Sequence, residues 1–117
     1  MKLRDIVTDE VTKKAIGTSD DLESRLVEPG TILEVRHVSV ENRTTAYTRL
    51  VIGVADALSF FQKEEQDSPA ANNLYWTHHK FLIPAGKKLR ARLTGCTAGD
   101  NIHMTYEGFL WEADQEG

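Results

Sequence analysis

Alternation of apolar and polar residues in the carboxy-terminal half is the feature that most constrains the fold. Two segments, Lys88–Thr94 and Ile102–Glu107, show it, with glycine-containing turn residues between them. A period of two residues is that of a β-strand with one buried face, and the intervening turn favours antiparallel pairing. The apolar phase here and in Ala46–Ala57 predicts a buried core of Leu50, Ile52, Val54, Leu89, Leu93, Ile102, Met104 and Tyr106.

The middle of the chain is also rich in strand signals. In Thr31–Glu41 the apolar phase changes between Val35 and Val38, which puts Leu33 and Val35 on one face and Val38 and Val40 on the other and predicts a β-bulge. Ala46–Ala57 is expected to be its hairpin partner. Gln62–Asn73 is polar and predicts a long surface loop, followed by a strand over Leu74–Ile83. Short strands with regular turns and no helical period predict an all-β fold, an antiparallel β-sandwich or jelly roll.

The turn-forming trio Glu28-Pro29-Gly30 predicts a division of the chain. We expect residues 1–28 to be an N-terminal arm and residues 29–117 to be the sandwich domain. Thr18–Asp21 could cap a short helical turn that reaches Leu26. The arm could fold back on its own domain, stay mobile, or lie across a neighbouring subunit.

Composition narrows the classes of partner. The chain has 117 residues, which suits one domain, and a net charge of −4 from 18 acidic and 14 basic residues. This charge disfavours general binding to nucleic acids or anionic membranes. Cys96 is the single cysteine, so no intrachain disulfide can form. Met1–Glu10 carries charges throughout and does not have the apolar run of a signal peptide.

A succession of short motifs in the second half carries a resemblance. Ile83-Pro84-Ala85-Gly86 precedes the basic alternating strand, and Gly99-Asp100 and Glu107-Gly108 bracket the next one. Over about residues 29 to 112 the chain resembles the small β-sandwich virion proteins of tailed bacteriophages, such as capsid decoration (cement) proteins.

The resemblance implies a jelly-roll-like structural protein, made in the host cytoplasm and located in the virion. Its partners would be copies of itself, in a trimer for example, and a major capsid or other virion protein. A neck or tail protein is the alternative placement. The resemblance transfers no functional residue, because such proteins share an architecture more than a site motif.

The sequence gives no set of catalytic residues, and we expect neither an enzyme nor a metal or other cofactor. His78 and His79 are adjacent, and neighbouring strand residues face opposite sides of a sheet, so they cannot share a metal on one face. Cys96 lacks a local signature for a nucleophile. A cupin-like enzyme remains an alternative that would need two or three histidines converging on a metal.

With no catalytic or metal-binding set, we expect the chain to act through surfaces that bind other proteins. We do not expect a small-molecule ligand. Tyr75, Trp76 and His79 would have to form an exposed aromatic platform if the chain were a carbohydrate- or receptor-binding module. Arg90 and Arg92 form a basic stripe with Lys88 that could pair with Glu107 or Glu112 across the sheet, or with an acidic residue of another subunit. The full set of candidate interface residues is Leu3, Ile6, Val7, Val11, Tyr75, Trp76, His79, Arg90 and Arg92.

Overall fold

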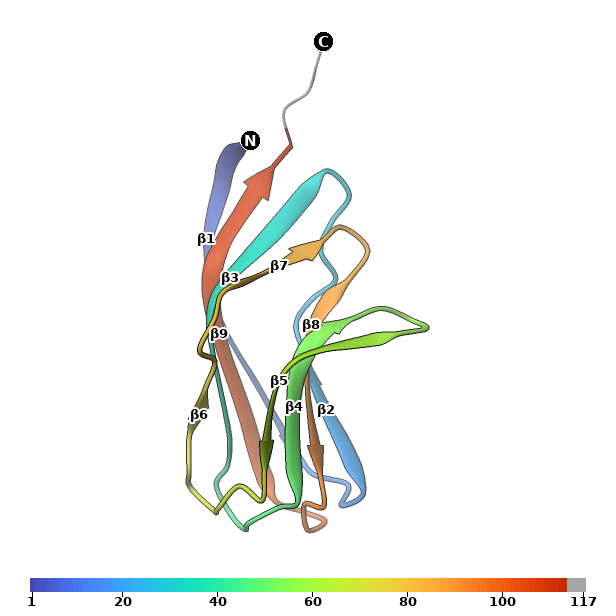
Figure 1. The fold of residues 1–117 in the computed structure, drawn as a ribbon, viewed down its shortest axis with the longest axis vertical. Helices are drawn as coiled ribbons and strands as arrows, with labels where there is room; N and C mark the ends of the chain where they lie inside the picture. The colour runs from blue at the N-terminus through green and yellow to red at the C-terminus, as the bar shows by residue number, and fades with distance from the viewer. Residues whose placement is uncertain (114–117) are drawn as a thin grey trace.

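The protein is a single all-β domain in which two antiparallel sheets pack face to face (Figure 1). The computed structural model describes residues 1–113, and residues 114–117 lie outside the described residues. The strands are β1 (Lys2–Lys14), β2 (Ser19–Glu23), β3 (Thr31–Asn42), β4 (Arg49–Ala55), β5 (Phe60–Asp67), β6 (Tyr75–Trp76), β7 (Phe81–Pro84), β8 (Lys88–Thr94) and β9 (Asn101–Glu112).

The strand order is that of a jelly roll. Sheet A has the order β1-β9-β3-β6, with β7 also paired to β3, and sheet B has the order β2-β8-β4-β5. If β6 and β7 are counted as one interrupted strand, each sheet contains four strands, and the chain passes repeatedly from one sheet to the other. Eight strands in two such sheets make a jelly roll, which confirms the predicted fold class.

The amino-terminal segment folds back on the domain, the first of the three placements expected for it. Strand β1 pairs with β9 along almost its whole length, and β2 pairs with β8, so residues 1–28 contribute one strand to each sheet. The helical turn expected from Thr18 to Leu26 is wrong. Leu22 on β2 is fully buried, and the Asp20 carboxylate accepts hydrogen bonds from the backbone N–H groups of Ile16 and Gly17, which stabilises a turn between two strands.

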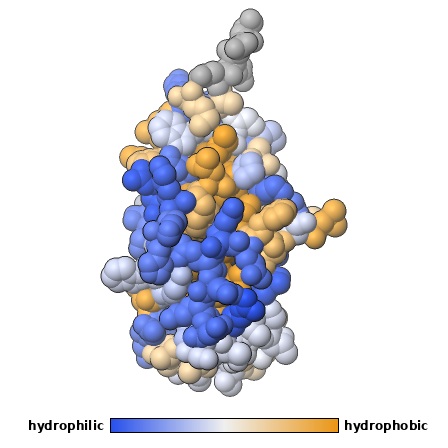
Figure 2. All heavy atoms as spheres, in the orientation of Figure 1, coloured by the Kyte–Doolittle hydropathy of each residue, from blue (hydrophilic) through white to orange (hydrophobic). Residues whose placement is uncertain are grey.

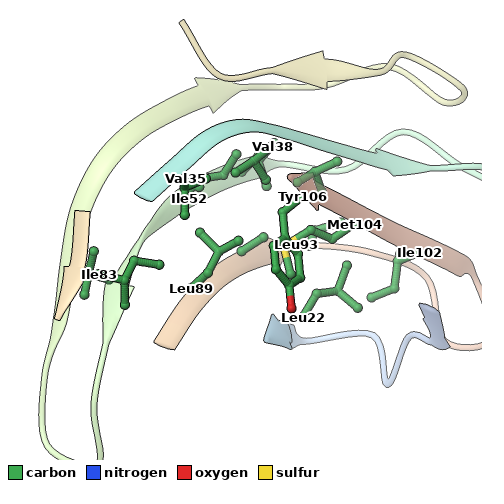
Figure 3. Packing of buried hydrophobic residues seen from close by; sticks show 14 of the residues in the cluster. Leu22, Val35, Val38, Ile52, Ile83, Leu89, Leu93, Ile102, Met104 and Tyr106 are labelled. Atoms are coloured by element: carbon green, nitrogen blue, oxygen red, sulfur yellow. The ribbon is translucent and has the colours of Figure 1, made fainter. Parts of the chain in front are cut away.

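The core lies between the sheets and confirms the predicted set, because all eight residues of that set are buried (Figure 3). The predicted bulge in β3 is also present, between Val35 and His37 in the pairing with β9. Its consequence differs from the expectation. The extra residue resets the alternation, so the apolar residues on both sides of the bulge point into the same core: Leu33, Val35, Val38 and Val40.

Three local predictions are wrong. Strand β4 is not the hairpin partner of β3, because it lies in sheet B between β8 and β5. The expected loop Gln62–Asn73 contains most of β5, an edge strand whose polar residues face solvent and therefore read as a loop. The expected strand Leu74–Ile83 is interrupted, and its two histidines lie between β6 and β7.

Within residues 1–113 there is no helix with the length and apolar character needed to cross a membrane.

Candidate protein-binding surface

The outer face of sheet A carries apolar side chains in two adjacent cross-strand rows near the chain termini. In the first row Leu3 pairs with Trp111, which pairs with Ile32. In the second row Ile6 pairs with Phe109, which pairs with Glu34, and Glu34 pairs with Leu82. Side chains opposite one another in neighbouring strands lie on the same face of a sheet, so these residues form one surface. We call it the apolar face: Leu3, Ile6, Ile32, Leu82, Phe109 and Trp111.

Much of this surface is open to solvent. Leu3 is 43% exposed, Ile6 67% and Leu82 57%. The two large rings lie edge to face with centroids 6.2 Å apart, and each is held from the side. The guanidinium of Arg36 lies 5.7 Å from the Phe109 ring, and the Trp111 indole N–H donates to Glu34 at 3.0 Å. Aromatic side chains that are fixed before binding contribute large contact areas at low entropic cost.

The amino-terminal candidates divide between the two sides of β1. Leu3 and Ile6 belong to the apolar face, as expected for interface residues. Val7 and Val11 lie on the other side of β1, half-buried against the core, so their packing is already provided by their own domain. A register shift between Leu3 and Asp5 changes the phase of the alternation, so that Leu3 and Ile6 share the outward face.

Sequence reasoning missed Leu82, Phe109 and Trp111. A signal for the two rings was present, because Ile102, Met104 and Tyr106 define the inward phase of β9. Continuing that phase puts Leu110 inward and the two rings outward. The sequence had no comparable signal for the facing of Leu82. The bulge in β3 and the break before β7 interrupt the alternation from which it would have been predicted.

The basic stripe is paired within the chain, and the expected partners Glu107 and Glu112 are wrong. Arg92 makes a bidentate pair with Asp21, with N–O distances of 2.8 and 3.1 Å. Arg90 pairs with Glu23 at 2.6 Å, and Lys88 also contacts Glu23 at 2.9 Å. Both arginines also lie over the ring of Phe60. The expectation failed because the acidic partners come from β2, a strand that the sequence did not reveal.

The expected platform of Tyr75, Trp76 and His79 does not form. Tyr75 packs against the core and donates its hydroxyl to Glu64 at 2.7 Å. Trp76 is 60% exposed on the outer face of sheet A, where its ring centroid is 6.2 Å from that of His37. His79 is exposed in the segment between β6 and β7. The three side chains therefore do not share a surface.

Glu64 on β5 joins the open edges of the two sheets. Its carboxylate accepts hydrogen bonds from the Tyr75 hydroxyl and from the backbone N–H groups of His78 and His79. The His78 ring nitrogen Nδ1 is 3.1 Å away. Burial alone would raise the pKa of Glu64, but these hydrogen bonds outweigh burial and place its pKa below the ordinary value. The Glu64 carboxylate therefore fixes the segment between β6 and β7. Strand β7 carries Leu82 of the apolar face.

This contact predicts a specific acid sensitivity. A carboxyl group with a lowered pKa in the folded state stabilises the fold above its unfolded pKa of about 4.5, and this stabilisation is lost as the pH falls through the lower folded value. Glu64→Gln should reduce the unfolding free energy at pH 7 by about 1–2 kcal/mol, and should reduce the loss of stability that occurs as the pH falls from 7 to below about 4.5. Urea denaturation across this pH range measures both effects.

Glu65→Gln is the matched control. Glu65 is the next residue, more exposed, and pairs with Arg49 at the surface. Its replacement should cost less than about 0.5 kcal/mol and leave the acid dependence nearly unchanged. Equal effects of the two substitutions would contradict the role assigned to Glu64.

The tip of the β4–β5 hairpin is a second exposed apolar feature. It projects from the sandwich in Figure 1 and is hydrophobic in Figure 2. Leu58 at this tip is 95% exposed. The Asp56 carboxylate binds Lys87 at 2.5 Å and accepts the N–H groups of Leu58 and Ser59, which lowers the pKa of Asp56 to about 2. The turn is thus well braced. Phe61 on the same hairpin is also 53% exposed, so this second apolar feature is confined to one hairpin.

The reactive residue types do not gather into a recognisable centre. Across residues 1–113, no group of three or more histidine, cysteine, aspartate or glutamate side chains is arranged to hold a metal ion. Cys96 is buried, and burial raises the pKa of its thiol. A thiol with a raised pKa is a poor nucleophile because little thiolate is present at neutral pH.

The chain matches no protein-family model, and no curated protein is significantly similar to it in sequence.

Proposed function

We propose that this protein is a non-enzymatic structural protein of a tailed-phage virion, a capsid decoration (cement) protein that binds the shell and stabilises it. The apolar face carries the proposal, as the surface that contacts the shell. Copies of the same chain are the second kind of partner.

Three observations support a binding role for the apolar face. It extends across β1, β9, β3 and β7, with Glu34 between Phe109 and Leu82, whereas ion pairs occupy the outer face of β2 and β8 in sheet B. Its centre contains two aromatic rings, the residue type enriched where binding energy is concentrated. Large exposed apolar patches on soluble domains mark interaction sites. The phage assignment itself comes from the sequence resemblance, and jelly rolls are common in viral capsid proteins.

If the protein belongs to the neck or tail of the virion, the same apolar face would bind a neck or tail protein instead of the shell. A carbohydrate- or receptor-binding module is the second candidate, and the observation that favours it is the exposed Trp76 ring beside His37. An exposed indole can stack on a sugar ring. Titration with glycans, followed by the tryptophan fluorescence of a Trp111→Phe variant in which Trp76 is the one remaining indole, separates this function from shell binding.

The test is co-sedimentation of the purified chain with shells assembled from the major capsid protein encoded near its gene. The double substitution Ile6→Lys and Leu82→Lys places two charges on the apolar face and should weaken binding by about 30-fold or more, because each charge would have to be desolvated at the interface. Unchanged binding by this variant would exclude the apolar face. Absence of binding by the wild-type chain to head shells, with binding to isolated necks or tails, would move the protein to that part of the virion.

Thr105→Lys is the matched control. Thr105 on β9 is exposed on the same outer face of sheet A, directly opposite Ser39 on β3. It lies in the polar half of that face. This substitution adds the same kind of charge outside the apolar face and should leave binding within about twofold of the wild type.

A further inference from the structure

We infer that two copies of this chain pair edge to edge through β1, antiparallel and centred on Val11, so that their A sheets join across a two-fold axis. The inference deepens the proposed self-association and rests on it, but it does not depend on shell binding.

Strand β1 supplies a long open edge. It has 13 residues, contains neither proline nor glycine, and pairs with β9 on one side. Its other side is the end of sheet A in the strand order. A long edge strand is a template for pairing with another chain, and charges along it oppose pairing except in a register where they are complementary. The Glu10 N–H in β1 donates to the Asp9 carboxylate at 2.8 Å, a local bond that pairing with a second copy would replace.

The charges along β1 are complementary to themselves in one antiparallel register. With Val11 opposite Val11 of the second copy, Asp9 lies opposite the other copy's Lys13. Glu10 lies diagonal to the other copy's Lys14, within reach of long side chains. Each contact occurs twice because of the two-fold axis. No like charges lie directly opposite one another between Thr8 and Lys14, and the one like-charged diagonal pair is Glu10 with Glu10 of the other copy.

The same register also accounts for two exposed isoleucines. Ile6 and Ile16 lie five residues before and five residues after Val11, and they are 67% and 71% exposed. Pairing centred on Val11 therefore brings Ile6 of each copy to the Ile16 of the other, at both ends of the paired segment. Pairing with the β9 side continues past Lys14 to Ala15, whose N–H donates to the Asp100 carbonyl at 2.8 Å, and Ile16 is the next residue, at the start of the turn to β2.

Existing contacts of the central charges are compatible with this pairing. Asp9 accepts the Tyr106 hydroxyl at 3.1 Å and the Glu10 backbone N–H at 2.8 Å. Lys13 donates to the Asp21 carbonyl at 3.3 Å and lies 3.7 Å from the Asp20 carboxylate. A carboxylate offers about four acceptor positions and an ammonium three donors, so both groups retain capacity for a second partner. Lys14 and Glu10 are exposed and point away from the core, and one Glu10 carboxylate oxygen lies 3.4 Å from Nδ1 of His103.

The arrangement has a consequence for binding. A two-fold axis closes a dimer and not the trimer that the resemblance suggested. The two apolar faces would lie on one side of a continuous sheet, so one dimer would present two shell-binding surfaces. Such a bivalent arrangement increases avidity without any new contact in the single chain.

The test is sedimentation equilibrium of the full chain and of two charge reversals, Glu10→Lys and Lys14→Glu. The wild type should be a dimer. Each variant alone should dimerise at least about tenfold more weakly, because each replaces two attractions by two repulsions. An equimolar mixture of the two variants should recover a heterodimer, because the reversed charges are again opposite. A monomeric or trimeric wild type, or no recovery in the mixture, would overturn the inference.

A cross-link determines the register. Val11→Cys should give a disulfide-linked dimer under mild oxidation, because the two positions face each other across the axis. Val7→Cys is the control, since Val7 is also half-buried on the inner side of β1 but would face Ala15 of the other copy. Cross-linking of the control and not of Val11→Cys would overturn the proposed register. Both variants keep the apolar face, so shell binding tests the proposed function separately.

Discussion

Gly108→Ala should destabilise the protein by about 3 kcal/mol or more in urea denaturation, although it adds one methyl group. Gly108 lies on β9, the strand between β1 and β3, opposite Val7 and Val35. A Cβ atom at this position would lie far inside van der Waals contact with the Glu34 carbonyl oxygen, and 2.9 Å from the carbonyl carbon. Both atoms are backbone, so relief requires movement of a central strand at the bulge in β3.

The comparison that isolates this clash is Gly86→Ala. Gly86 has a φ of +83° in the turn before β8, with nothing within 4 Å of an added Cβ. Its replacement should cost about 1–2 kcal/mol, from the left-handed backbone alone. Gly108 is not among the glycines with positive φ, so alanine there would otherwise stabilise the fold slightly by restricting the unfolded chain. A loss at Gly108 no larger than that at Gly86 would show that β9 and β3 can separate at little cost.

The sequence predicted the strands whose one face is buried and whose other face is polar. Strand β8 and the first half of β9 alternate without interruption, and their inward residues were identified correctly. The bulge in β3 was predicted from the change of phase, but its effect on facing was not. A phase change alone does not say whether the strand turns over or whether an extra residue restores the original face.

Edge strands were the part that sequence reasoning missed. Strands β1, β2 and β5 each end a sheet and carry many charged residues, so they were interpreted as an arm or a loop. Four of the nine interface candidates were misplaced for this reason, namely Val7, Val11, Arg90 and Arg92. Without β2, Arg90 and Arg92 have no intrachain partner, and without β1 as a strand, Val7 and Val11 cannot be distinguished from Leu3 and Ile6. Pairing between strands distant in sequence is set by the whole sheet and not by local pattern.

Leu93→Ala should reduce the unfolding free energy by about 2–5 kcal/mol, as expected for a buried leucine whose removal leaves a cavity. Leu93 is fully buried on β8, in register with Asp20 of β2 and Leu50 of β4, so it packs where the amino-terminal segment joins sheet B. Partial relaxation of the cavity is restricted because β8 is paired on both sides. The substitution therefore tests both the core and the incorporation of residues 1–28 into it.

Leu82→Ala removes the same atoms from the apolar face, where the side chain is 57% exposed. Its effect on stability should stay below about 1 kcal/mol, because little apolar area is returned to water and no cavity forms. The two leucines should therefore separate the two roles of apolar residues in this fold. Leu93→Ala should weaken folding, with shell binding by the folded fraction unchanged, whereas Leu82→Ala should weaken binding with folding nearly intact. A loss below about 0.5 kcal/mol for Leu93→Ala would place β8 with the wrong face toward the core.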